Sequence, residues 1–242
     1  MDSYVRQSSR HLSRISPAQW FTIELRRFSF PVYYLGMQPL TSSSAIICLP
    51  NQASTAERFI VLGQLLQADN DTSTAVIALG HPDSSYFWFP KPTFDAPLEL
   101  QQPYLSMSLA AIEQLCQRLA QHIPIDAISL FGFADSACLA LEYLVRCGYP
   151  LNAVIAPSGL LLGTSLDTSD RFNTASTRTK VFLSIGGGIS AAQRVRFRQT
   201  EQLLKQCGYK VVTYTSERRP ETISPAELEM ARHVIVGSLP DC

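Results

Sequence analysis

The sequence predicts an α/β domain whose mostly parallel sheet is covered by helices on both faces. Apolar strand-like runs alternate with helical patterns along the chain, which favours this fold class. The runs are continuous rather than alternating, as in residues 45–49, and this is typical of buried parallel strands. The 242 residues, 46% of them hydrophobic, are enough for a sizeable core. We expect one domain over residues 21–242, preceded by an N-terminal extension over residues 1–20.

The first elements differ from the rest. Residues 21–28 and 30–35 are two extended runs with a short link, which predicts an antiparallel hairpin at one edge of the sheet. Residues 45–49 predict the first buried parallel strand. A helical pattern follows over residues 55–67.

The strand–helix unit then repeats to the C-terminus. The expected strands are 75–79, 127–133, 153–156, 180–185 and 210–215, and the expected helices are 105–121, 135–147 with a Gly148 cap, 190–207 and 225–236. Two long connections, 80–103 and 157–178, follow the carboxyl ends of predicted strands. Open α/β sheets bind ligands at that edge, so we expect both connections to contribute to function.

Charge and composition exclude several classes of function. Twenty basic residues balance twenty acidic ones, so no strong field is expected to attract nucleic acid or an anionic membrane. No apolar run approaches the length of a membrane span, which predicts a soluble protein. Six cysteines without C-x-x-C spacing predict free thiols in a reducing compartment, and we expect a cytoplasmic protein.

Neither a metal nor a cofactor is indicated. The four histidines lie far apart in the sequence, which argues against a zinc site. The glycine run at residues 186–188 lacks the spacing of a dinucleotide-binding loop and a P-loop lysine, so we interpret it as a strand-to-helix turn.

The most informative segment is the strand–turn–helix over residues 128–148. A nucleophile elbow places a serine on a sharp turn between a buried strand and a helix, with small residues two positions before and after it. Here Gly132 and Ser136 are the small flanking residues, and Ala134 stands at the tip. A methyl group cannot attack a carbonyl, so this elbow has no nucleophile.

Residues 44–236 resemble the phospholipase/carboxylesterase family of α/β-hydrolases, which includes the acyl-protein thioesterases. Residues 128–141 follow the family's strand, G-F-S-Q-G elbow and small-residue helix without a gap. Residues 153–159 look like its next strand, and residues 223–228 match the helix start that follows its catalytic Gly-His. The resemblance implies an α/β-hydrolase fold, with a serine–aspartate–histidine triad in active members.

Each catalytic position departs from that pattern. Ala134 replaces the nucleophile, Ile189 aligns with the triad aspartate, and Glu221 aligns with the triad histidine. The His-Gly pair whose loop supplies an oxyanion NH aligns with Pro50 and Asn51. The sequence therefore predicts a catalytically inactive relative that binds a small acyl or aromatic ligand or a protein partner. It specifies neither the ligand nor the oligomeric state.

Two alternatives remain at this point. Either the elbow is displaced by two residues and Ser136 is the nucleophile, or a hydrolase or lyase uses Glu221 or His81 as its base. The candidate ligand-pocket residues are Gln52, His81, Trp88, Ala134, Asp135 and Glu221.

Two of these candidates have roles that we specify further. The backbone NH groups of Gln52 and Asp135 are expected to form an oxyanion-like nest, although the Asp135 carboxylate would oppose an anion there. Trp88 belongs to an aromatic stretch that either covers the core or lines a ligand site.

Overall fold

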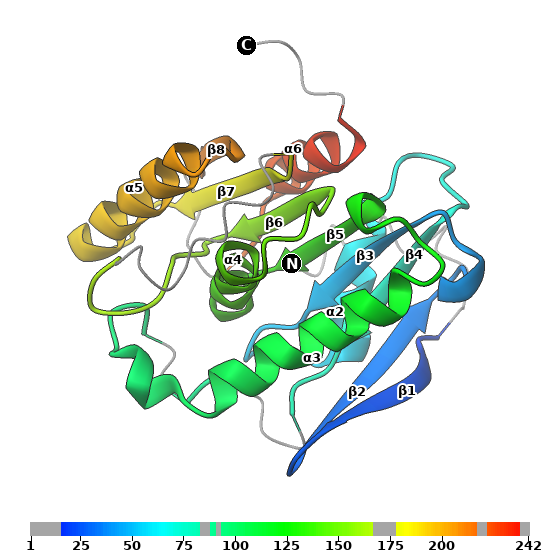
Figure 1. The fold of residues 1–242 in the computed structure, drawn as a ribbon. Coiled ribbons are helices and arrows are strands. Elements are labelled where there is room, and N and C mark those ends of the chain that lie inside the picture. Colours follow the sequence, from blue (N-terminus) through cyan, green and yellow to red (C-terminus); the bar gives the residue numbers. More distant parts are fainter. Residues whose placement is uncertain (1–15, 83–87, 91–92, 167–177, 217–221, 238–242) are drawn as a thin grey trace.

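A single sheet organises the described part of the chain. The computed structural model describes residues 16–82, 88–90, 93–166, 178–216 and 222–237. Within these ranges eight strands form one sheet, with the bounds β1 Ala18–Leu25, β2 Phe28–Leu35, β3 Ser44–Leu49, β4 Thr74–Leu79, β5 Ile128–Gly132, β6 Ala153–Pro157, β7 Lys180–Gly186 and β8 Lys210–Ser216. Their spatial order is β1-β2-β4-β3-β5-β6-β7-β8 (Figure 1).

The strand directions confirm the predicted sheet. β3 to β8 pair in parallel with their neighbours, whereas β1 and β2 form an antiparallel hairpin that joins the sheet through β4. Every residue of β4, β5 and β6 is buried. Burial on both faces explains why these strands are continuous apolar runs in the sequence.

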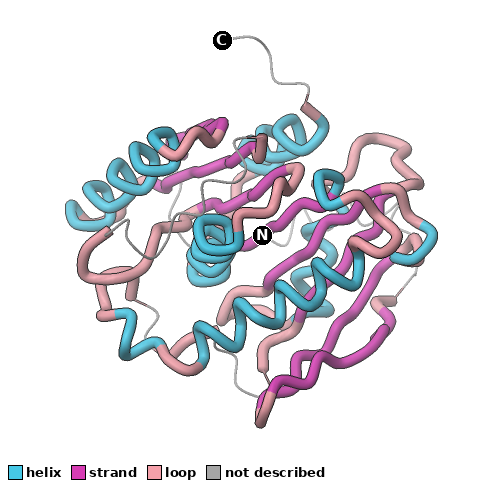
Figure 2. Tube along the Cα trace, in the orientation of Figure 1, coloured by secondary structure: helices cyan, strands magenta, loops and turns pink. Residues whose placement is uncertain are grey.

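Helices cover both faces of the sheet (Figure 2). The five α-helices among the described residues are α2 Ala56–Gln64, α3 Tyr104–Leu119, α4 Asp135–Cys147, α5 Ala191–Gln206 and α6 Pro225–Val236. Residues of α3, α4 and α5 belong to one apolar core, and residues of α2 and α6 belong to a second core on the opposite face. None of the described helices is long and apolar enough to cross a membrane.

The turn of the N-terminal hairpin lies earlier than the sequence pattern predicts. It is at Arg26, and Leu25 pairs with Phe28 across it, whereas we expected the first strand to continue to Phe28. Phe28, Phe30 and Val32 are all buried, which places them at alternate positions on one face of the same strand. The period-two pattern of buried residues thus assigns Phe28 to β2.

The N-terminal region contributes to the sheet before residue 21. β1 begins at Ala18, so the last residues of the expected extension over residues 1–20 belong to this strand. Residues 1–15 lie outside the described residues.

Candidate functional site

A sharp turn between β5 and α4 holds Ala134 at its tip. The backbone of Ala134 has φ 56° and ψ −113°, a strained conformation for a residue with a side chain. Its NH donates to the carbonyl of Pro157 at the end of β6 (3.1 Å), and its carbonyl accepts from the NH of Cys138 in α4 (3.0 Å). The side chain is half-buried. This backbone is the elbow that the sequence predicts, with a methyl group where a nucleophile would stand.

Small residues make this turn possible. A Cβ atom added at Gly132 would lie 2.5 Å from both the carbonyl carbon and the oxygen of Ser136. A Cβ at Gly159, in the loop after β6, would lie 2.8 Å from the Cβ of Ala137. Larger side chains at either glycine would therefore force strand and helix apart.

Ser136 is buried beneath the turn. Its hydroxyl accepts a hydrogen bond from the NH of Phe133 (2.9 Å) and donates one to the carbonyl of the same residue (3.1 Å). None of its surface is exposed to solvent. A nucleophile must reach a substrate, so this geometry argues against Ser136 in that role.

The Asp135 carboxylate lies against the NH groups that were expected to form an anion-binding nest. The NH of Gln52, in the loop after β3, donates to Oδ1 of Asp135 (3.2 Å). Burial raises the pKa of Asp135 from 3.8 to about 6, and backbone hydrogen bonds from Gln52, Asp135 and Ser136 oppose this increase in part. The carboxylate in the first turn of α4 thus pays a desolvation penalty, which hydrogen bonds from these backbone NH groups offset in part.

Asp135→Asn is expected to raise the free energy of unfolding at neutral pH. A folded-state pKa of about 6 against an ordinary 3.8 means that the folded protein binds more protons between these values. Its stability therefore falls as the pH rises through that window. We expect a gain of about 1 to 3 kcal/mol above pH 7 that disappears below pH 4. Urea unfolding at several pH values measures it.

The matched control for this prediction is Asp126→Asn. Asp126 is exposed and precedes β5, at the opposite end of that strand from Ala134. Asp126→Asn removes the same negative charge from an exposed position, where the charge has no desolvation penalty. A pH-independent difference between the Asp135→Asn variant and the wild type would contradict the assignment.

His81 and Trp88 brace the loop that carries Gln52. Their ring centroids lie 4.7 Å apart, and Nε1 of Trp88 donates to the carbonyl of Pro50 (2.6 Å). The backbone carbonyl of Trp88 accepts from Oγ of Ser108 in α3 (2.9 Å). Burial lowers the pKa of His81 to about 4, so its imidazole is neutral at neutral pH. Only 1% of Trp88 is exposed, and it packs within the apolar core.

The remaining predicted positions lie after β7 and before α6. Ile189 follows β7, is half-buried, and packs against the apolar core that contains α4 and α5. Glu221 lies outside the described residues. α6 begins as the sequence indicates, with Ser224 as its N-cap and a capping box completed by Glu227.

The structure adds two contacts that the sequence analysis missed. The carbonyl of Pro157 accepts the NH of Ala134, so the end of β6 holds the tip of the elbow in place. Oγ of Ser184 in β7 donates to Oε1 of the buried Glu227 (2.6 Å), which ties β7 to α6. The first contact has a sequence signal in the Pro-Ser-Gly end of the strand, and the second has none.

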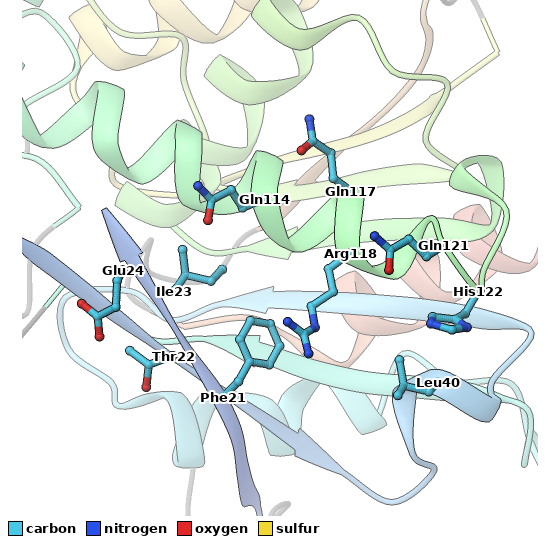
Figure 3. Close-up of a pocket in the computed structure, with 10 residues that line it drawn as sticks. All are labelled: Phe21, Thr22, Ile23, Glu24, Leu40, Gln114, Gln117, Arg118, Gln121 and His122. Atoms are coloured by element: carbon cyan, nitrogen blue, oxygen red, sulfur yellow. The ribbon is translucent and has the colours of Figure 1, made fainter. Parts of the chain in front are cut away.

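Two surface cavities lie away from the elbow. The first, of about 490 Å³, lies between β1 and α3, with Gln114, Gln117 and Arg118 of α3 along one side (Figure 3). The second, of about 460 Å³, is lined by residues of α5 and of the loop after β6. Ala134 lines neither cavity. Within the described ranges, no three His, Cys, Asp or Glu side chains are placed to hold a metal ion.

Known structures share this fold. A phospholipase/carboxylesterase from Dyadobacter fermentans superposes with a TM-score of 0.77 at 25% identity, covering 90% of this chain and all of its own. The carboxylesterase of Bacillus cereus gives 0.66 at 11% identity over 98% of both chains. That of Mesorhizobium loti gives 0.65 at 12% identity over 89% of this chain and 99% of its own. The last two likenesses show the fold alone.

The sequence itself also matches a family model. Among curated proteins none matches the chain. Residues 77–236, about two thirds of the chain, match the model of the phospholipase/carboxylesterase family, and this region includes the elbow. The chain therefore belongs to the phospholipase/carboxylesterase family of α/β-hydrolases.

Proposed function

We propose that the protein is a catalytically inactive member of its family, a pseudoenzyme that binds a small acyl or aromatic ligand or a protein partner. Binding occurs at the carboxyl edge of the sheet, through the elbow and the two long connections after β4 and β6. The observation that carries the proposal is Ala134 at the tip of an intact elbow. The backbone retains the nucleophile's conformation although the side chain has no reactive atom.

Ile189 and Ser136 support the same conclusion. Ile189 packs against the apolar core, and its side chain has no group that could orient an imidazole. Ser136 is buried and bonded within its turn. A hydroxyl without an imidazole base is a weak nucleophile near neutral pH. The loss of one triad residue therefore removes most of the rate enhancement that the other two could give.

Catalysis with another base receives less support. A general base works best when its pKa lies near the operating pH, and burial lowers the pKa of His81 to about 4. The His81 ring also packs on the buried Trp88 rather than standing at the surface. Glu221 lies outside the described residues, so its role as a base stays a prediction. A hydrolase or lyase dependent on it is the alternative.

A cytoplasmic location is part of the proposal. Cys48, Cys116, Cys138, Cys147 and Cys207 are free thiols. Burial raises the pKa of Cys48 well above its ordinary value, as expected for an unreactive core thiol. Free buried thiols support a reducing compartment.

A paired assay tests the proposed function. We expect no turnover of short-chain p-nitrophenyl esters or thioesters above the buffer rate. In a thermal-shift panel of fatty acids and aromatic acids and amines, a ligand at about 100 times its Kd should stabilise the protein by about 2.7 kcal/mol. For a chain of this size that is a rise in Tm of about 5 to 10 °C.

Two alanine-to-methionine variants locate the binding. Ala134→Met fills the tip of the elbow and should abolish the shift, whereas Ala191→Met, at an exposed position of α5, should retain it. Turnover that depends on Glu221 would contradict inactivity. A Tm shift that survives in the Ala134→Met variant would place the ligand elsewhere.

A further inference from the structure

The charge at the elbow has the opposite sign to that of an oxyanion-binding site. In hydrolases with this elbow, the NH that follows the nucleophile and an NH from the loop after the first parallel strand bind a developing negative charge. The corresponding groups here are the NH groups of Asp135 and Gln52. The NH of Gln52 donates to the Asp135 carboxylate (3.2 Å), so an anion of the chain itself already lies against these donors.

The carboxylate is held there by more than one element. Asp135 is the first residue of α4, where a negative charge is stabilised by the helix dipole. Backbone NH groups of Gln52, Asp135 and Ser136 hydrogen bond with it. The Gln52 donor comes from the loop after β3, 83 residues away in the sequence, and the buried Trp88 anchors that loop through the carbonyl of Pro50. The position of the carboxylate is therefore built by the fold.

No cation among the described residues compensates this charge. Burial is the largest influence on the pKa of Asp135, and the groups that oppose it are backbone NH donors. Asp135 is nevertheless only half-buried, as is the adjacent Ala134, so both can be reached from solvent. A half-buried carboxylate without a cationic partner gains free energy from any ligand that donates a hydrogen bond or carries a positive charge.

We propose that Asp135 determines the ligand class of this site by reversing its polarity, so that it accepts an ammonium or another hydrogen-bond donor and rejects carboxylates and ester carbonyls. The proposal rests on the proposed function and narrows it, because among the ligands considered for the non-catalytic site it favours amines over acyl ligands. Because Ala134 has no hydroxyl, the space that a nucleophile would fill next to Asp135 is open to the ligand. The whole chain has a formal net charge of zero, so a preference for cations would come from the site itself.

The test compares two probes of the same length, butylammonium and butyrate, at about pH 7.5, above the pKa of about 6. Binding is followed by the backbone amide resonances of Gln52 and Asp135 in ¹⁵N-labelled protein. The wild type should bind butylammonium about 10-fold more tightly than butyrate, since unlike charges attract and like charges repel at a half-buried site. Asp135→Asn should bring the ratio to about one or below, because the NH groups become free for butyrate.

Two further variants secure the interpretation. Asp135→Gln introduces the side chain of the related G-F-S-Q-G elbow and should also remove the cation preference. Asp126→Asn removes the same charge from the exposed segment before β5 and should retain the wild-type ratio. Equal preferences in the wild type and both Asp135 variants, or no binding of butylammonium to the wild type, would overturn the inference.

If the protein is an active enzyme and the proposed function is wrong, a separate measurement shows it. Ester turnover by the wild type would show that the site is catalytic, and it is measured without these probes. The amide resonances report the polarity of the site whether or not turnover occurs.

Discussion

Gly132→Ala is expected to destabilise the protein by about 3 kcal/mol or more, because an added Cβ meets backbone atoms that cannot move independently. The clash involves the carbonyl carbon and oxygen of Ser136 at 2.5 Å and the NH nitrogen of Ala137 at 2.7 Å. Relief requires α4 to move away from β5, and this would disrupt the buried contacts around the elbow. Urea unfolding monitored by circular dichroism measures the loss.

Gly36→Ala is the control for this substitution. Gly36 has φ 80° and open space within 4 Å around its added Cβ, so only the backbone conformation opposes the change. We expect a loss of about 1 kcal/mol. Equal losses at the two glycines would show that the elbow is not sterically tight.

Ala134→Ser alone should give no esterase, although the elbow backbone is already in place. The new hydroxyl would have no imidazole to take its proton, and a general base contributes about 10² to 10⁴ in rate. We expect hydrolysis of p-nitrophenyl butyrate to rise by less than about 10-fold over the wild type. Robust activity in this single variant would mean that a histidine such as His81 serves the site as a base.

Restoring the other positions should raise activity in two steps. Ala134→Ser combined with Ile189→Asp and Glu221→His supplies the triad, and we expect a gain of about 10² or more over Ala134→Ser alone. Adding Asp135→Gln frees the NH groups that the carboxylate occupies and should give a further 10² or so. The same triple variant with Asp126→Asn in place of Asp135→Gln should show no second gain.

Much of the fold can be predicted from the sequence because burial leaves a simple pattern. β4 and β5 are buried on both faces and appear as uninterrupted apolar runs, and α4 ends at Gly148 in the left-handed conformation. The hairpin turn is less clear. Phe28 is apolar in either strand, and only the alternation of buried residues in β2 assigns it.

The elbow can also be predicted from the sequence, because Gly132, Ala134 and Ser136 lie close together in the chain and their spacing is typical of this turn. The contact between Gln52 and Asp135 joins residues 83 positions apart. The sequence pattern does not determine where the NH of Gln52 or the carboxylate of Asp135 points. The sequence suggested that Asp135 would oppose an anion near these NH groups. It could not show that the carboxylate itself binds the NH of Gln52.

The buried aromatic pair was ambiguous for a related reason. A tryptophan in a long connection either lines a ligand site or covers the core, and composition does not separate the two. The structure places Trp88 in the core through its hydrogen bond to Pro50 and its contact with His81.

The elbow is intact but carries no nucleophile, and intact-mass analysis after treatment with a fluorophosphonate probe tests this most directly. The wild-type protein should gain no mass, because Ala134 has no reactive atom and the hydroxyl of Ser136 is buried and hydrogen-bonded within the turn. Stoichiometric labelling that peptide mapping places at Ser136 would contradict the account and return the protein to the active serine hydrolases.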